Sequence, residues 1–332
     1  MQTTEKENRA EAVTTMRCYL TSFKKNTAAV AFSLAALLFV ITIVINPQGF
    51  NNMFIGSVIL MTTLLSISAA GQTIVLIGGG MDFSVGAVMS AAAIITAYTM
   101  DSTDGRFLPV LLMSLAMGAM VGLLNGFFVV KIGLPPMIVT MAVANIVSRM
   151  QYVLTSGSPS GWTGPKFIQS VIYRFFDTIP SIVLYAAVAF PLIFWLLQRS
   201  RFGKQVYMVG NNRRAAFLNG VKVNRIIIFT YVLSGMLSAF AGILGAGYKA
   251  TARCDIFNDY AFTSLVAVIV GGTTFSGGVG TFSGTVAGAL LMTVLSNLLT
   301  TLGLPQTFRD ILNGVIIILL LMLYNRSKAV RQ

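Results

Sequence analysis

Long apolar runs dominate this sequence, and few charges interrupt them. Asp82 is the only acidic residue between Glu11 and Asp101. Of the 332 residues, 55% are hydrophobic and 10% are charged, whereas soluble proteins carry about 25% charged residues. Most of the apolar runs are long enough for helices that cross a bilayer. The sequence therefore predicts an all-α polytopic membrane protein with about ten transmembrane helices.

The expected spans begin after a polar N-terminal segment and continue almost to the end of the chain. We expect spans near Thr27–Ile45, Met53–Ile77, Val85–Met100, Leu108–Val130, Met137–Leu154, Ser181–Leu197, Arg225–Ala246, Phe262–Val270, Phe282–Leu302 and Ile311–Tyr324. Most are long enough to cross a bilayer. This reading divides the chain into a cytoplasmic segment, residues 1–26, one membrane domain, residues 27–324, and a cytoplasmic tail, residues 325–332.

The basic residues predict the orientation. Most of the 23 Lys and Arg residues lie in the N-terminal segment, in the loop of residues 198–225 and at the C-terminus. Basic loops stay on the cytoplasmic side, so both termini are expected on the cytoplasmic side of the membrane. The net charge of +13 is thus explained by orientation, and we expect no nucleic acid partner.

Catalytic chemistry is not expected. The chain has no histidine, which removes the commonest general base and zinc ligand, so we expect neither an enzyme nor a metal site. Gly272–Gly278 resembles a phosphate-binding loop, but Gly278 stands where the lysine would be. We expect no cofactor on this chain, and any ATP must be bound and hydrolysed by a partner.

Glycine interrupts two of the apolar runs in a similar pattern. Residues 79–86 and 271–278 both read GGxxFSxG, and Gly-Leu-Pro follows later at 133–135 and again at 303–305. Consecutive glycines are poor helix formers, and paired glycine-broken segments mark transport pathways. We expect a duplicated half. The span count places both glycine motifs on the cytoplasmic side, whereas an inverted repeat would place them on opposite sides; the sequence leaves this open.

Several residues are candidates for the pathway and its gates. A carboxylate among apolar residues suggests a functional site, but Asp82 can equally cap the helix that begins near Ser84. Arg149 can serve a polar solute or reach towards the membrane surface. The candidates are Gly79, Gly80, Asp82, Ser84, Gly86, Asn125, Arg149, Gly271, Gly272, Gly277 and Gly278.

The basic loop of residues 198–225 is the longest cytoplasmic connection. Asn211 or Asn212 can cap a short helix that runs through Leu218 and ends at Gly220. The functional interpretation is a docking helix for a cytoplasmic subunit, and the plain alternative is a solvated basic loop.

Three stretches resemble the membrane permease of ribose-type (sugar) ABC importers, in the branched-chain amino acid and monosaccharide permease superfamily. Residues 79–86 resemble the family signature GG-I-D-L-S-V-G, with Met81 and Phe83 as departures. Residues 268–280 resemble V-I-G-G-T-S-x-x-G-G-x-G. Residues 202–221 resemble F-G…Y-A-x-G-x-N-x-x-A-A…G-I, with Arg214 where an acid is usual, which suggests a differently tuned contact with the ATPase.

The resemblance implies a fold like that of type II ABC importers, often described with an inverted repeat and broken or re-entrant segments. It implies four partners: an ATP-binding subunit, a second permease copy or paralogue, a periplasmic solute-binding protein and membrane lipid. The residues implied in coupling to the ATPase are Phe202, Gly203, Tyr207, Gly210, Asn212, Ala215, Ala216 and Gly220.

The expected function is import of a monosaccharide or similar polyhydroxylated solute, energised by ATP hydrolysis on a separate subunit. Two alternatives stay open. One is a permease for another small solute such as a branched-chain amino acid, for which charged pathway residues would be expected. The other is an ion-coupled secondary transporter, in which Asp82 is the only well-placed acid.

Overall fold

The structure, a computed structural model, describes residues 27–251, 253–305, 307–308, 311–312 and 314–315. The all-α prediction is confirmed: the strands within these residues are β1 (Arg174–Phe175) and β2 (Ile179–Pro180), which form one short hairpin. The helices are α2 (Thr27–Ile45), α3 (Asn52–Ile77), α4 (Val85–Met100), α5 (Phe107–Phe127), α6 (Pro136–Leu154), α7 (Pro165–Ile172), α8 (Ile182–Gln198), α9 (Arg201–Asn211), α10 (Arg213–Leu218), α11 (Val223–Lys249), α12 (Tyr260–Val270) and α13 (Phe282–Thr301). Short 3-10 turns lie at Pro47–Gly49 and Asp104–Arg106, and a π-helical turn, Phe128–Ile132, follows α5.

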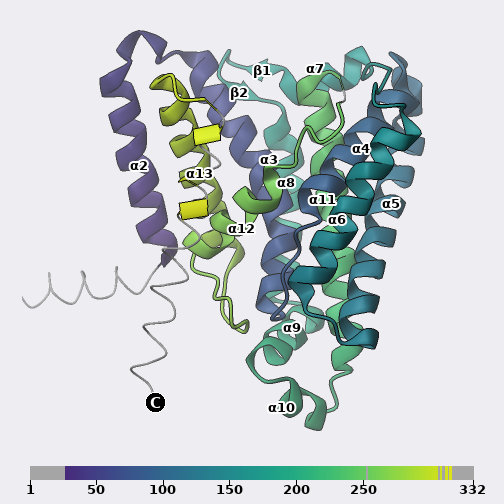
Figure 1. Cartoon of the computed structure of the whole chain (residues 1–332). Helices are drawn as coiled ribbons and strands as arrows, with labels where there is room; N and C mark the ends of the chain where they lie inside the picture. Colours follow the sequence, from purple (N-terminus) through teal and green to yellow (C-terminus); the bar gives the residue numbers. More distant parts are fainter. Residues whose placement is uncertain (1–26, 252, 306, 309–310, 313, 316–332) are drawn as a thin grey trace, which may run out of the picture.

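The bundle has two distinct ends. The hairpin of β1 and β2 lies with α7 at one end, here named the β1 side, and α9 and α10 extend from the other, here named the α9 side (Figure 1). Helices α3, α11 and α13 form the interior, since they are far more buried than α2, α5 or α6, and α3 and α11 pack against each other. Their central position allows both to contact the broken segments described below.

Small residues hold the interior helices together. Gly118, Gly122 and Gly126 repeat at every fourth position of α5, and a Cβ at any of them would overlap the backbone of α11. In α3, Gly71 lies in the same way against Ser234 of α11. Such stripes let helix backbones approach closely, which is the main source of packing between helices in lipid. The sequence contains this spacing, but the partner helix could not be identified from it.

The predicted span boundaries are close to those observed, but the helices are unequal. In the described chain six helices are long and apolar enough to cross a membrane, or seven if α8 and α9, bent by 57°, form one span. Helices α4 and α12 are apolar but shorter, because each borders a glycine break. The last expected span, Ile311–Tyr324, lies almost wholly outside the described residues.

Both glycine motifs lie on the α9 side, as the span count predicted. Tyr260 at the start of α12 and Met61 of α3 line one cavity towards the β1 side. At the opposite end, the break that follows α12 is joined to the last residue of α3 by a hydrogen bond from the Gly278 N–H to the Ile77 carbonyl. Helices α3 and α12 therefore run in the same direction into their breaks.

The two Gly-Leu-Pro turns lie on opposite sides. Gly133 lines a pocket with Arg213 at the α9 side. Thr301, two residues before Gly303, lines a pocket with Asn46, which follows the last residue of α2. The first residue of α2, Thr27, bonds to the second break at the opposite end of that helix. The second Gly-Leu-Pro turn therefore lies on the β1 side. The Gly-Leu-Pro match therefore fits an inverted repeat, whereas the GGxxFSxG match does not. No single duplication, direct or inverted, therefore relates both motifs.

Candidate functional site

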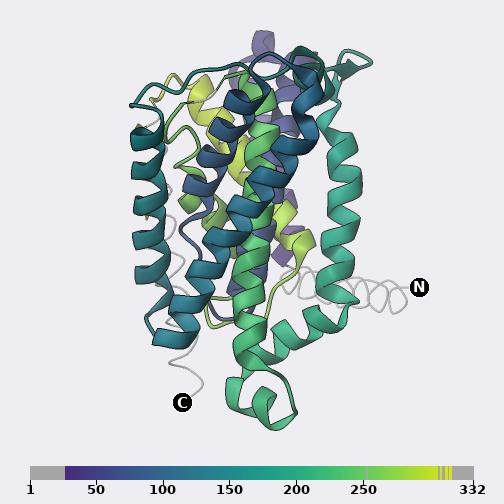
Figure 2. The same ribbon diagram turned by 90° about the vertical axis from the view of Figure 1, so that its right-hand side faces the viewer.

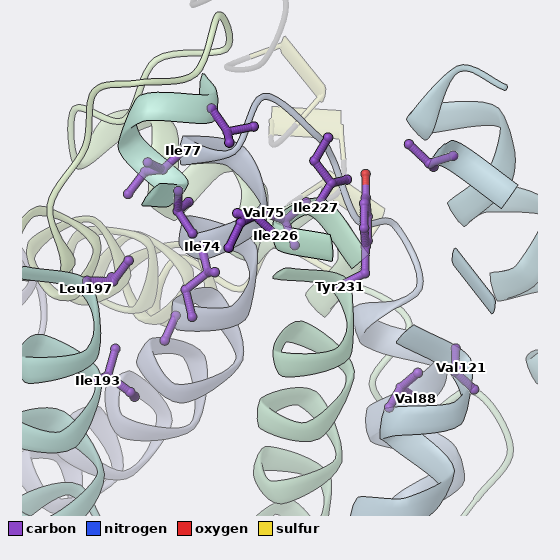
Figure 3. Close-up of a cluster of buried hydrophobic side chains, with 14 of the residues drawn as sticks. Ile74, Val75, Ile77, Val88, Val121, Ile193, Leu197, Ile226, Ile227 and Tyr231 are labelled. Atoms are coloured by element: carbon purple, nitrogen blue, oxygen red, sulfur yellow. The ribbon is translucent and has the colours of Figure 1, made fainter. Parts of the chain in front are cut away.

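The first break follows α3. Gly79 has a φ of +79°; its N–H bonds to the Leu76 carbonyl at 2.9 Å, and the Gly80 N–H bonds to the Val75 carbonyl at 3.0 Å. This is a Schellman ending, which requires a left-handed residue and hence favours glycine. Gly80 then lies against the hydroxyl of Tyr231, where a Cβ would not fit. The glycines thus stop α3 and let the chain turn back into the bundle. Figure 3 shows Ile74, Val75 and Ile77 at the end of α3 in one cluster with Ile226, Ile227 and Tyr231 of α11.

Asp82 is the centre of a buried polar network. It is 1% exposed, and one carboxylate oxygen accepts from the Ser84 N–H at 2.9 Å and from the Ser84 hydroxyl at 2.5 Å. The other oxygen accepts from Ser234 Oγ at 2.7 Å, and Asn125 Nδ2 donates to Ser84 Oγ at 2.9 Å. Asp82 thus closes a turn directly before α4, but the N-cap of that helix is Ser84, whose side chain makes no capping bond, so the expected cap at Asp82 is not the geometry observed. The same side chain also ties the break to α5 and α11.

This network lies deep in the bundle, because Ser234 is near the middle of α11. All the donors to Asp82 are neutral, and within the described chain no basic side chain pairs with it. Gly86, one turn further on, lies against the backbone of Phe257 and Asn258. A buried carboxylate held only by hydroxyls and an amide orients backbone segments.

The second break has the same ending. Gly272 has a φ of +97°; its N–H bonds to the Ile269 carbonyl at 2.9 Å, and the Thr273 N–H bonds to the Val268 carbonyl at 3.1 Å. Gly272 therefore corresponds to Gly79. The sequence alignment had paired Gly79 with Gly271, so it was wrong by one residue. The third consecutive glycine hid this offset.

Three segments far apart in the sequence meet where the breaks come together, and we name Ile77, Gly210 and Gly278 the glycine junction. The Gly278 N–H donates to the Ile77 carbonyl at 2.8 Å. A Cβ on Gly210 of α9 would overlap that carbonyl and crowd the Gly278 nitrogen. Tyr207 Oη, one turn earlier in α9, donates to the Gly280 carbonyl at 2.7 Å. Helix α9 thus contacts both breaks at once.

The short helix predicted after Asn211 or Asn212 is present as α10, but the 11 residues before it form a helix, α9, that was not predicted. Asn212 is the N-cap of α10 and accepts from the Ala215 N–H at 3.0 Å, and Gly220, with a φ of +78°, ends that helix. Gly203 lets α9 lie against the last carbonyls of α8, where a Cβ would overlap. Phe202 packs on the core and Ala216 is buried, whereas Ala215 is exposed.

Two residues of this loop were missed. Phe217 and Leu218, at the end of α10, are 69% and 77% exposed. Two large exposed apolar side chains on the outermost helix of the α9 side are candidates for an interaction surface. Their apolar character in a segment with Arg213, Arg214 and Asn219 was the available signal. We name Phe217 and Leu218 the α10 tip.

Arg149 does not lie at either glycine break. It is exposed on α6, with its guanidinium carbon 5.3 Å from the centre of the Tyr152 ring. Asn145, one turn before it, is also exposed. The structure therefore does not bring Arg149 to the breaks; instead, Asn145 and Arg149 form a polar stripe on the outside of the bundle.

Gln72 is a further polar residue that the sequence reasoning missed. It is fully buried in α3 beside Gly71, and neither amide atom has a hydrogen-bond partner among the described residues. The next residue, Thr73, bonds through its hydroxyl to Thr285 of α13 at 2.6 Å. Open hydrogen-bonding capacity in a core is uncommon. Gln72 and Thr73 place polar atoms along α3 between the network at Asp82 and the β1 side.

The site offers hydrogen bonding and close backbone contact. The described part of the chain has no cluster of His, Cys, Asp and Glu that could hold a metal ion. Its distinctive property is mechanical: a bent helix on one surface is joined through glycines to two breaks inside the bundle.

Known proteins share this sequence over most of its length. The profile of the family described as "Branched-chain amino acid transport system / permease component" matches residues 54–321. The ribose import permease of Escherichia coli K12 is 30% identical over 307 residues, which cover 89% of this chain and 94% of that protein.

Two further relatives are similar to the same extent. The galactose/methyl galactoside import permease of Haemophilus influenzae is 32% identical, covering 88% of this chain and 91% of that protein. The ribose import permease of Bacillus subtilis is 29% identical, with the same two coverages. No solved structure matches the chain.

Proposed function

Because the chain belongs to the family of branched-chain amino acid transport system permease components, we propose that it imports a monosaccharide or similar small polyhydroxylated solute. ATP is bound and hydrolysed on a separate subunit, and the membrane is the bacterial inner membrane. The choice of solute class rests on the relatives, which are named as ribose and galactose import permeases. The neutral amides and hydroxyls of Asn125, Gln72 and Ser234 suit such a solute.

The glycine junction is the observation that carries this proposal. A permease driven by another subunit needs a rigid connection between its docking surface and the segments that open and close. Helix α9 supplies it, since it is bent by 57° from α8 and contacts the Ile77 carbonyl and the Gly280 carbonyl. Helix α10, which carries the α10 tip, follows α9 in the sequence and projects from the bundle (Figure 1). We place the ATPase at this tip.

The polar stripe on α6 supports a second permease copy or paralogue. An exposed asparagine at the middle of a spanning helix and an exposed arginine one turn beyond it are costly against lipid and face protein or a water-filled path instead. We therefore propose that Asn145 and Arg149 face the other permease and line the pathway between the two. A periplasmic binding protein would deliver solute to the opposite, β1 side.

The experiment that tests the function is uptake into vesicles that contain the permease, its ATPase and its binding protein. We expect labelled monosaccharide to accumulate only when ATP is present on the side of the membrane where the ATPase is bound. Ionophores that collapse proton and sodium gradients should leave this uptake unchanged. Uptake that needs an ion gradient and no ATPase would favour the secondary transporter.

The first prediction concerns the α10 tip. Phe217→Asp puts a charge where we expect an apolar pocket of the ATPase, so binding should weaken by at least about tenfold, as for a buried interface anchor. The measurement is recovery of the ATPase with tagged permease from solubilised membranes.

Phe176→Asp is the matched control. Phe176 is 93% exposed on the β1 side, so the same change there should leave recovery of the ATPase unaltered. Equal recovery with Phe217→Asp and the control would remove the α10 tip from the docking surface.

The second prediction concerns orientation. In a chain without Cys18 and Cys254, single cysteines at positions 5 and 330 should react with a membrane-impermeant maleimide only after the inner face is opened, because the basic segments stay inside. A cysteine in place of Phe176 is the control and should react from outside. Labelling of either terminus in intact cells would reverse the orientation.

A further inference from the structure

A large apolar groove opens in the side of the bundle between α5, α8 and α11. Its volume is about 950 Å³. Leu111 and Leu115 of α5 line one wall, and Leu233, Leu237 and Phe240 of α11 line the floor. The opposite wall is formed by α8, which stands apart from α5 and α11 (Figure 2).

The polar groups of the groove gather at one end. Lys166, Gln169 and Ser170 of α7 lie at its mouth on the β1 side, and Ser170 Oγ lies 2.9 Å from Tyr185 Oη. Tyr173 is exposed beside them. Below this mouth the lining is hydrocarbon. Tyrosine and lysine beside an apolar surface are typical of the membrane interface.

The length of the groove matches one leaflet of a bilayer. Along α8 it extends from Ser181 to Ile193, which at about 1.5 Å per residue is ~18 Å. Half of a hydrocarbon core of about 30 Å is ~15 Å. Helix α8 continues beyond the groove to Gln198, where it packs on the core cluster through Leu197. The groove therefore ends near the middle of the membrane.

We propose that this groove binds one phospholipid of the outer leaflet, with an acyl chain between α8 and α11 and the phosphate at Lys166. The lysine at the mouth provides the complementary charge, and the hydroxyls of Ser170 and Tyr185 can bond to headgroup oxygens. Each buried methylene contributes about 0.8 kcal/mol relative to water, but the surrounding bilayer offers the same environment. Retention therefore depends on the headgroup contacts and on shape.

The shape of the groove argues against other occupants. Water does not fill an apolar cavity at membrane depth. A second copy of the chain would cover α8 along its whole length, whereas this groove is concave and confined to one leaflet. An acyl chain matches both its depth and its lining.

The lipid would act on coupling through α8. That helix bends by 57° into α9. The bend is possible because Gly203 has no Cβ, which would overlap the last carbonyls of α8. A chain wedged between α8 and α11 fixes the distance between them, and therefore the position of α9 at the glycine junction. The proposal does not depend on the identity of the solute.

The test measures lipid bound to the assembled importer after extraction into detergent, by native mass spectrometry. Wild-type permease should retain a phospholipid, preferentially an anionic one. Ala189→Trp fills the groove and should lower retention about tenfold, equivalent to ~1.4 kcal/mol. Ala187→Trp is the matched control, because Ala187 is exposed on another face of the same helix and should retain lipid as wild type does.

A second pair of variants avoids any effect on packing. Lys166 is exposed, so Lys166→Glu should fold normally and lose the preference for anionic lipid, while Lys166→Arg should keep it. Unchanged retention in Ala189→Trp, or an unchanged preference for anionic lipid in Lys166→Glu, would overturn the proposal. So would a disulfide between two copies that each carry Val188→Cys in the groove, since a second chain would then occupy it.

Discussion

In the Gly210→Ala variant, ATP-driven uptake should fall by at least about tenfold, equivalent to more than ~1.4 kcal/mol of the barrier. The permease should still insert and still bind its ATPase. The reason is local: the added Cβ overlaps the Ile77 carbonyl and crowds the Gly278 nitrogen. Helix α9 must then move away from both breaks, while the α10 tip stays exposed. ATP hydrolysis should continue without solute movement.

Gly105→Ala is the control for this change. Gly105 lies in a 3-10 turn on the β1 side and has no atom within 4 Å of the position of its Cβ. Uptake and hydrolysis should match wild type. If Gly210→Ala retains full coupling in vesicles with the same amount of inserted protein, the glycine junction is not the connection between ATPase and pathway.

Asp82→Leu should abolish uptake, whereas Asp82→Asn should retain a measurable part of it. Leucine leaves the Ser84 N–H, the Ser84 hydroxyl and the Ser234 hydroxyl without their acceptor, and each buried orphan costs about 1–3 kcal/mol. The sum is comparable with the whole stability of many proteins, about 5–15 kcal/mol. Asparagine still accepts from Ser84, and the Ser234 hydroxyl can turn to accept from the new amide.

The comparison requires vesicles that contain equal amounts of each variant, with thermal stability in detergent measured alongside uptake. The Leu variant should lose stability as well as transport. Asp82→Asn that is stable and assembled but transports nothing would mean that the negative charge itself is needed, and would favour ion coupling. A fully active Asp82→Leu would leave the glycines as the essential feature of this break.

The helices of this protein were predictable because their signals are local. The apolar run at Val85–Met100, the cap at Asn212 and the end at Gly220 each depend on neighbouring residues, and the structure has them where the sequence placed them. The polar character of Asp82 was likewise visible, but its bond to Ser234 of α11 was not, and the N-cap of the following helix is Ser84 and not Asp82.

Contacts between distant segments were not predictable. Ile77 carries no signal of its own, because it takes part in the glycine junction through its carbonyl. The offset between Gly79 and Gly271 was hidden by three consecutive glycines, and the opposed Gly-Leu-Pro turns became evident only with the helix directions. Arg149 was placed correctly in its span, but a helix has several faces and the sequence did not tell which one meets the bundle.

The hydrogen bond from Gly278 to Ile77 also has a consequence for biogenesis. The acceptor leaves the ribosome long before its donor is made. Translation adds roughly 5–20 residues per second, so the 201 positions from residue 77 to residue 278 take about 10–40 s. During that interval the Ile77 carbonyl at the end of α3 must accept its hydrogen bond from water or from the insertion machinery. The bond therefore closes late and joins the two halves only once both have entered the bilayer. A chain truncated before residue 278 should insert its first helices yet stay sensitive to proteases at residues 78–80, and acquire resistance only when the second break has been synthesised.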